Sequence, residues 1–129
     1  MSDPHAVLYV EDESLIRELA SIALEEAGFE VVAAENGAAA FDALDGNADP
    51  FCAIVTDVDL GGGPDGWAVA HRARELDDAL PVIYVSGASG HEWQLKGVPH
   101  SVMISKPFKM AQIVSAVLSL VKKVRRKHS

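Results

Sequence analysis

The sequence predicts an α/β fold built around a parallel sheet. Short apolar runs alternate along the chain with longer amphipathic segments, which is the pattern of repeated strand–helix–strand units. The 129 residues, of which 49% are hydrophobic, match the size of one domain with one buried core. No repeat or linker interrupts the alternation. We therefore expect a single domain over residues 1–129, with its core at about residues 5–121.

The first strand and the first helix are predicted near the N-terminus. The apolar run 6–10 is the first strand, and Ser14 can cap a helix that continues to about residue 27. Gly28 ends this helix, because glycine is favoured just beyond a helix C-terminus. The apolar side chains at helical spacing lie on one face of this helix: Leu15, Ile16, Leu19, Ile22 and Ala23.

The remaining elements follow from the same alternation. The expected strands are 29–33, 51–56, 82–86 and about 102–104. The expected helices are 36–44, 67–76, a short helix within 91–96, and about 110–123 or beyond. Glycines and a proline between residues 87 and 100 leave room for only a short helix in that segment. The last helix should bury Ile113, Val114, Val117, Leu118 and Val121.

Charge is distributed unevenly along the chain. The formal net charge is −8, yet residues 122–129 contain five of the eleven Lys and Arg residues and none of the nineteen acids. The acidic remainder argues against DNA binding by the domain itself. The basic end could contact nucleic acid, an anionic membrane or an acidic partner. We favour a simpler interpretation, in which these cations complement the dipole of the last helix.

Several other classes of protein are disfavoured. The apolar runs are too short to span a bilayer, and the N-terminus lacks the features of a signal peptide, so we expect a cytoplasmic protein. Cys52 is the single cysteine and lies in an apolar run, which indicates packing rather than chemistry. The five histidines lack the spacing of zinc ligands.

Polar residues follow or close the apolar runs: Glu11, Asp12, Asp57, Ser86 and Lys106. The carboxyl ends of parallel strands meet at one crevice, so these side chains should lie together. Three neighbouring carboxylates repel one another unless a cation intervenes, and Mg²⁺ suits such hard oxygen ligands. A lysine and a hydroxyl can contact a phosphoryl group. Together these groups could form an acyl phosphate on an aspartate.

The segments that contain these residues resemble the receiver domains of bacterial two-component response regulators. The resemblance covers essentially the whole chain and is carried by residues 7–13, 54–60, 65–66, 82–87 and 105–108. It implies a flavodoxin-like, doubly wound five-stranded parallel sheet of strand order 2-1-3-4-5, with helices on both faces.

The resemblance also implies roles for the acidic residues. Asp57 would accept a phosphoryl group from a histidine kinase or a histidine phosphotransfer protein. Asp12 and Asp57 would ligate Mg²⁺ directly, and Glu11 would act through water. Asp59 matches the position whose backbone carbonyl binds the metal, so its carboxylate need not take part.

Two further residues match the family's switching apparatus, and one departs from it. Ser86 matches the hydroxyl residue that contacts the phosphoryl group, and Lys106 matches the family's lysine. Phosphorylation adds charge and acceptor oxygens that can draw Ser86 and the following loop inward. Met103 stands where receivers usually carry an aromatic switch residue. Tyr84, two residues before Ser86 and on the same side of that strand, is a candidate substitute.

The resemblance therefore predicts a phosphorylatable switch, with no enzymatic activity beyond its own phosphorylation and dephosphorylation. No DNA-binding module follows the last helix, so output would pass through a downstream protein partner. The choice of kinase would depend on the exposed face of the first helix, which includes Leu15, Arg17, Glu18 and Ser21. Two alternatives remain open. One is a receiver-like scaffold that needs no phosphate, and the other is a phosphatase of the haloacid-dehalogenase type, which the sequence 57–59 faintly resembles.

Overall fold

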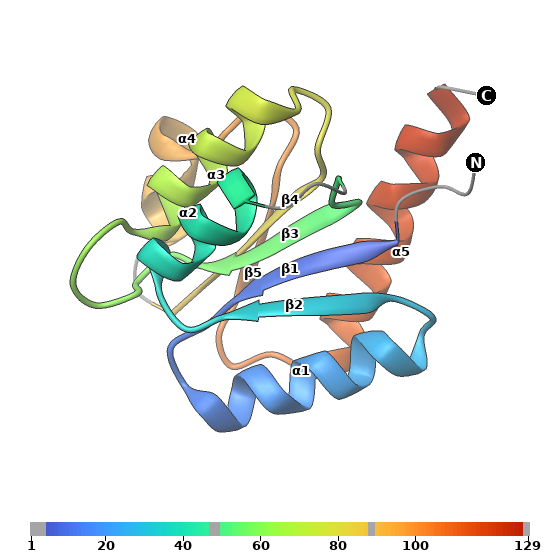
Figure 1. The fold of residues 1–129 in the computed structure, drawn as a ribbon, viewed down its shortest axis with the longest axis horizontal. Coiled ribbons are helices and arrows are strands. Elements are labelled where there is room, and N and C mark those ends of the chain that lie inside the picture. The colour runs from blue at the N-terminus through green and yellow to red at the C-terminus, as the bar shows by residue number, and fades with distance from the viewer. Residues whose placement is uncertain (1–4, 47–49, 88–89, 128–129) are drawn as a thin grey trace.

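The computed structural model describes residues 5–46, 50–87 and 90–127, and it shows a sheet enclosed between two layers of helices (Figure 1). All strands are parallel, and their order across the sheet is β2-β1-β3-β4-β5. The strands are β1 (Ala6–Val10), β2 (Glu30–Ala34), β3 (Ala53–Asp57), β4 (Val82–Ser86) and β5 (Val102–Ser105). The expected flavodoxin-like, doubly wound fold is therefore confirmed.

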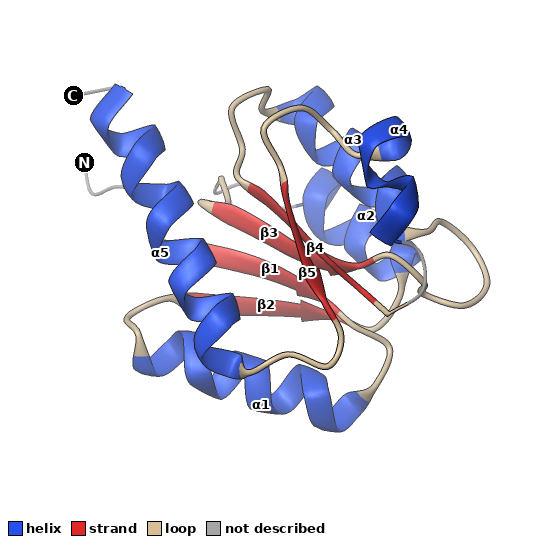
Figure 2. Ribbon diagram, turned by 180° about the vertical axis from the view of Figure 1, so that it is seen from behind, coloured by secondary structure: helices blue, strands red, loops and turns tan. Residues whose placement is uncertain are grey.

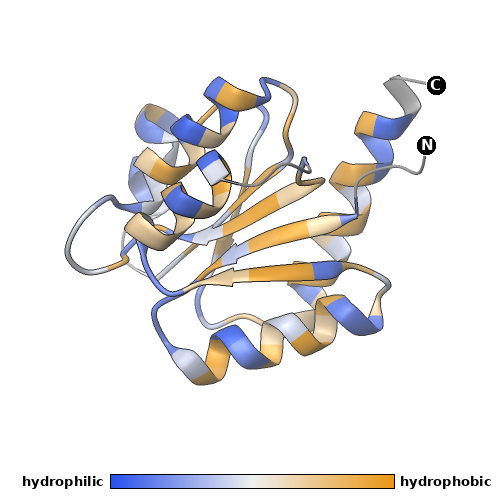
Figure 3. Ribbon diagram, in the orientation of Figure 1, coloured by the Kyte–Doolittle hydropathy of each residue, from blue (hydrophilic) through white to orange (hydrophobic). Residues whose placement is uncertain are grey.

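Helices cover both faces of the sheet. They are α1 (Ser14–Glu26), α2 (Gly37–Gly46), α3 (Gly66–Leu76), α4 (Trp93–Lys96) and α5 (Met110–Lys127), and a 3₁₀ turn, Gly90–Glu92, leads into α4. Helices α1 and α5 lie on one face, and α2, α3 and α4 lie on the other (Figure 2). Because both faces are covered, β3 and β4 are buried along their full length, and the strands are largely apolar (Figure 3).

Most element boundaries agree with the sequence pattern, and the differences bear on the site. Strands β1 and β4 occupy the predicted residues. Strand β3 was predicted over 51–56 but begins two residues later, at Ala53, and ends one residue later, because Asp57 pairs with Val85 of β4. Helix α5 continues to Lys127, so most of the basic end is helical, and residues 128 and 129 lie outside the described residues. Within the described part of the chain, no helix combines the length and apolar character needed to cross a membrane.

Helix α1 buries a different face from the one predicted. Three side chains of the predicted apolar face are exposed: Leu15 (65%), Leu19 (46%) and Ile22 (46%). Of these, Leu15 was also expected on the kinase-facing surface, and its exposure agrees with that expectation. The buried residues are Ala20 and Leu24, which belong to the core cluster shared with α5. Two apolar stripes run along this helix, and packing against the sheet and α5 selects the stripe that contains the small Ala20. Leu118 of α5 was also predicted to be buried and is exposed.

The expected cap of α1 is also wrong. Glu13 occupies the N-cap position without a side-chain hydrogen bond, and Ser14 is the first residue of the helix. Helix α2 begins in the usual way, because the Asn36 Oδ1 atom accepts a hydrogen bond of 2.8 Å from the Ala39 N–H group. The start of α1 is instead determined by contacts of the loop that follows β1, which belongs to the candidate site.

Candidate functional site

Three carboxylates gather at the carboxyl ends of β1 and β3. Glu11 and Asp12 directly follow β1, and Asp57 ends β3. One oxygen from each of these side chains lies within 4.8 Å of the others, and this is the cluster of potential metal ligands found in the described residues. Glu11 and Asp57 are only 1% and 4% exposed, whereas Asp12 is exposed to solvent. The cluster therefore has a buried floor and one solvent-facing acid.

The loop after β1 is fixed by hydrogen bonds to Glu11. The Glu11 backbone N–H group donates to the carbonyl of Ala34 in β2 (3.0 Å), and the Glu11 carboxylate accepts from the backbone N–H group of Glu13 (3.1 Å). The Arg17 guanidinium donates to the Glu11 carbonyl at 2.8 Å. Arg17 was expected on the kinase-facing surface, but it is half-buried and also holds this loop in place. The sequence carries no local signal for this contact.

Lys106 supplies a cation to the cluster. Its Nζ atom donates to Asp57 Oδ2 at 2.8 Å and lies 3.9 Å from Glu11 Oε1. Lys106 follows β5, and its backbone N–H group donates to the carbonyl of Ser86 at the end of β4 (2.9 Å). Three strand ends therefore converge on Asp57, as the sequence pattern predicted.

Burial controls the protonation of the cluster. It raises the pKa of Glu11 to about 7, and a hydrogen bond with Asp12 acts in the same direction. Burial also raises the pKa of Asp57, although its hydrogen bond and charge interaction with Lys106 oppose this. For Lys106 burial alone would lower the pKa, but the hydrogen bond to Asp57 and the nearby carboxylates raise it overall. A divalent cation would favour the ionised form of these acids, so the donor set fits Mg²⁺.

Gly66 allows α3 to approach the end of β3. A Cβ atom at this position would lie 2.2 Å from the Asp57 carbonyl oxygen, so a side chain cannot be accommodated. The Gly66 N–H group donates to the Val58 carbonyl at 2.8 Å, and the preceding Asp65 caps the helix by accepting from the Ala68 N–H group. The pair Asp65-Gly66 thus fixes the backbone beside Asp57.

The other predicted site residues surround this centre. The backbone N–H group of Asp59 donates to Asp57 Oδ1 at 3.3 Å, and the carboxylate of Asp59 is not part of the three-acid cluster. Ser86 is 2% exposed at the end of β4. Tyr84 is fully buried, and Met103 is its partner in the register between β4 and β5.

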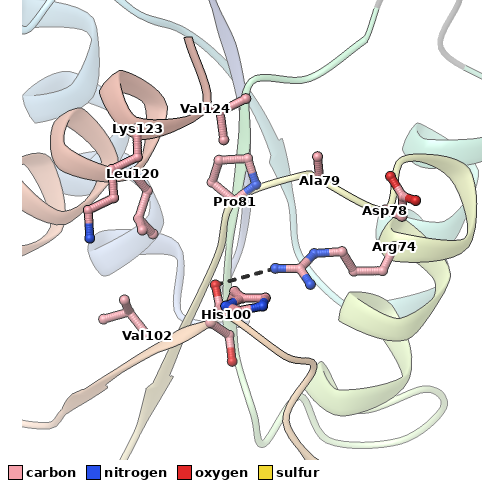
Figure 4. Close-up of a pocket in the computed structure, with 10 residues that line it drawn as sticks. Arg74, Asp78, Ala79, Pro81, His100, Val102, Leu120, Lys123 and Val124 are labelled. Carbon is pink, nitrogen blue, oxygen red and sulfur yellow. Dashed lines mark hydrogen bonds between the residues drawn. The ribbon is translucent and has the colours of Figure 1, made fainter. Parts of the chain in front are cut away.

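Among the described residues, two cavities lie at opposite ends of the strands near β5. The first, of about 400 Å³, lies beside the acidic cluster, and its lining residues are Ile16, Lys106, Pro107, Phe108 and Met110. The second, of about 620 Å³, lies near the start of β4 and β5. Arg74, His100 and Lys123 are among its lining residues (Figure 4). Only the first cavity adjoins the candidate site.

The strand order and the acid cluster with its lysine define a receiver-type signalling domain. The chain belongs to the response regulator receiver domain family, whose model matches residues 7–118. Members of this family are generally non-enzymatic signalling switches of two-component systems, and they interact with histidine kinases and downstream partners. This membership argues against the haloacid-dehalogenase alternative.

Individual relatives agree with this assignment. A response regulator receiver protein from Anaeromyxobacter sp. is 41% identical over 108 residues, which are 84% of this chain and 42% of that protein. The response regulator receiver protein CpdR from Brucella abortus is 30% identical over 113 residues, covering 86% of this chain and 92% of that protein. The crystal structure of a response regulator receiver protein from Sinorhizobium medicae superposes with a TM-score of 0.88 at 38% identity, covering 93% of this chain and 96% of that one.

Proposed function

We propose that the protein is a phosphorylatable switch that accepts a phosphoryl group on Asp57 from a histidine kinase or a histidine phosphotransfer protein. The observation that carries this proposal is the position of Asp57. It ends a buried strand, contacts Lys106 at 2.8 Å and shares a cluster with Glu11 and Asp12. A nucleophilic carboxylate, a fixed cation and a set of metal ligands are what phosphoryl transfer to aspartate requires.

Mg²⁺ is the cofactor that this donor set fits. Asp12 and Asp57 would hold it directly, Glu11 would hold it through water, and Asp59 would contribute its backbone carbonyl. When bound, the metal supplies charge that neutralises the oxygens of the transferred phosphoryl group. Lys106 supplies a second positive charge from the carboxyl end of β5, and Ser86 supplies a hydroxyl for a phosphoryl oxygen.

The transfer step follows from these positions. A carboxylate oxygen of Asp57 attacks the phosphorus of the donor's phosphohistidine, forming an O–P bond. The P–N bond breaks, and its electron pair returns to the imidazole nitrogen. Lys106, which donates a hydrogen bond to Asp57, stays close enough to neutralise the charge on the new acyl phosphate. Hydrolysis of the acyl phosphate would return the switch to its resting state.

The surface beside Asp57 suits the docking of a protein phosphodonor. Leu15 and Leu19 on α1 are exposed, and the 400 Å³ cavity next to Lys106 is lined by apolar side chains that include Phe108 and Met110. Exposed apolar groups next to a charged centre are typical of an interaction site. We place this exchange in the cytoplasm, with output through a downstream protein partner.

Phosphotransfer profiling tests the proposal. The protein is incubated with radiolabelled histidine kinases or with a small phosphodonor, in Mg²⁺ and in EDTA, and labelling is followed over time. We expect Mg²⁺-dependent labelling that Asp57→Asn abolishes and that Asp78→Asn, a change in the exposed α3–β4 loop, leaves intact. Labelling that survives in Asp57→Asn would overturn the assignment. A folded protein that neither accepts phosphate nor binds beryllofluoride would favour the phosphate-independent scaffold.

A further inference from the structure

Helix α4 and the loop 97–101 form one packed unit. The Trp93 ring of α4 lies against Gly97, where a Cβ atom would come within 2.4 Å of the ring. The Trp93 indole N–H group donates to Ser101 Oγ at 2.9 Å, and that hydroxyl donates to the Val98 carbonyl at 2.6 Å. Hydrogen bonds therefore connect helix α4 to the loop 97–101, and a displacement of the loop would change the environment of the Trp93 ring.

Tyr84 attaches this unit to β4. Its hydroxyl oxygen accepts a hydrogen bond of 3.1 Å from the Val98 N–H group, and its ring lies 4.7 Å from that of Trp67, centroid to centroid. Tyr84 is fully buried, so this polar contact is shielded from water. Side chains two residues apart on a strand share a face, so Tyr84 and Ser86 both face the α4 side of the sheet.

Other contacts join the same unit to α3 rather than to β4. The Arg74 guanidinium donates to the carbonyls of Pro99 (2.5 Å) and His100 (3.4 Å), as Figure 4 shows for the latter. The His71 ring donates to the Lys96 carbonyl at 3.0 Å. These hydrogen bonds hold the unit against α3, and none of them is made to β4.

Met103 offers no comparable link. It pairs with Tyr84 in the sheet register and is only partly buried against the same apolar cluster as Trp93. A thioether is flexible and has no hydroxyl with which to hold a backbone group. Met103 therefore packs beside the unit, and its side chain has no donor with which to bond a backbone carbonyl.

We propose that Tyr84, through its hydrogen bond to the Val98 backbone, carries the response of Ser86 to helix α4. This inference rests on the proposed function, because it requires a phosphoryl group on Asp57 that draws Ser86 toward it. A shift at the end of β4 moves Tyr84, the bond moves the loop at Val98, and the Ser101 hydroxyl and the indole N–H group transmit the movement to Trp93. Tyr84 is a positioning residue, and Met103 is dispensable for the coupling.

The Trp93 indole signal in a ¹H–¹⁵N NMR spectrum measures this coupling. Spectra of the full chain are recorded with Mg²⁺ alone and with Mg²⁺ plus beryllofluoride, and Trp93→Phe assigns the signal. ¹⁹F NMR of the bound beryllofluoride reports the occupancy of the site independently. We expect the Trp93 signal to move in the wild type, to move less than half as far in Tyr84→Phe, and to move fully in Met103→Leu, at equal occupancy.

The possible outcomes separate the two proposals. If no beryllofluoride binds to the wild type, the proposed function fails and the inference falls with it. If it binds but the Trp93 signal is unmoved, or moves equally in Tyr84→Phe, the role of Tyr84 is wrong while the proposed function stands. A movement lost in Met103→Leu would assign the coupling to Met103 instead.

A measurement on the wild type alone guards against a Tyr84→Phe variant that does not fold. The Val98 amide hydrogen is buried and bonded to Tyr84, so it should exchange slowly with solvent. Because the link must persist to transmit movement, slow exchange should continue after beryllofluoride binds. Loss of that protection on binding would show that the bond breaks, and it would overturn the inference.

Discussion

The raised pKa of Glu11 predicts that the metal-free protein loses stability as the pH rises from 5 to 8. The Glu11 carboxyl has a pKa of about 7 in the folded protein and an ordinary value of 4.5. Between these values the folded protein retains a proton that the unfolded chain releases. Proton release therefore favours the unfolded state, and the free energy of unfolding falls through this interval.

The magnitude follows from the two pKa values. Linkage between them gives a loss of about 2–3 kcal/mol from pH 5 to pH 8, a large share of the stability of a typical domain. Asp57, whose pKa is also raised by burial, contributes with the same sign. Mg²⁺ should reverse the loss at pH 8, because it binds the ionised acids, and it should add roughly 2.7 kcal/mol at a concentration one hundred times its Kd.

Urea unfolding followed by circular dichroism at pH 5, 6, 7 and 8, with EDTA or with Mg²⁺, measures this dependence. Glu11→Gln keeps the shape of the side chain but removes its titration, so its pH dependence should be flatter than that of the wild type. Glu26→Gln, an exposed change near the end of α1, should keep the wild-type slope. A metal-free wild type whose stability is constant or increases over this range, or a Glu11→Gln variant that parallels it, would refute the reasoning.

Three further predictions concern packing and the site. Gly66→Ala should destabilise the protein by about 3 kcal/mol or more in urea unfolding, because its Cβ atom would collide with the backbone beside Asp57. The control Gly46→Ala, where the added Cβ atom meets nothing, should be neutral or slightly stabilising, and equal effects of the two changes would contradict this prediction. Lys106→Met should slow labelling by a small phosphodonor on the order of 10²-fold, and an unchanged rate would remove the lysine from the mechanism. Leu15→Ala should change the free energy of unfolding by less than about 0.5 kcal/mol, yet it should slow phosphoryl transfer from the cognate kinase. Leu24→Ala, in the core, should lower the free energy of unfolding by about 2–5 kcal/mol. A larger loss of stability in Leu15→Ala than in Leu24→Ala would mean that the exposed stripe of α1 is misassigned.

The element order and the gathering of the strand-end residues at one crevice could be predicted because both depend on local patterns. An apolar run of strand period followed by a helical period is visible within a short window, and polar residues at the ends of such runs are exposed to the same crevice in any parallel sheet. Asp57 and Lys106 are 49 positions apart, yet the positions of their strands in the pattern sufficed to place them together.

The buried face of α1 could not be predicted, because its sequence offers two apolar stripes. Leu15, Leu19 and Ile22 are larger and more apolar than Ala20, so periodicity favoured them. Only the distance available between the helix, the sheet and α5 selects the stripe with the small residue. On α5 the predicted face is buried at Ile113, Val117 and Val121, and only its neighbour Leu118 is turned toward solvent.

The sequence by itself therefore determined the order of strands and helices, the residues of the acidic crevice and the absence of an aromatic ring at residue 103. Only the tertiary structure decided that Arg17 holds the Glu11 loop and that Tyr84 bonds to Val98. Each of these two hydrogen bonds joins a side chain to a backbone group elsewhere in the chain. Every residue except proline offers the same backbone N–H and carbonyl groups, so such contacts leave no trace in residue identity, and only the packed fold determines which group the side chain meets.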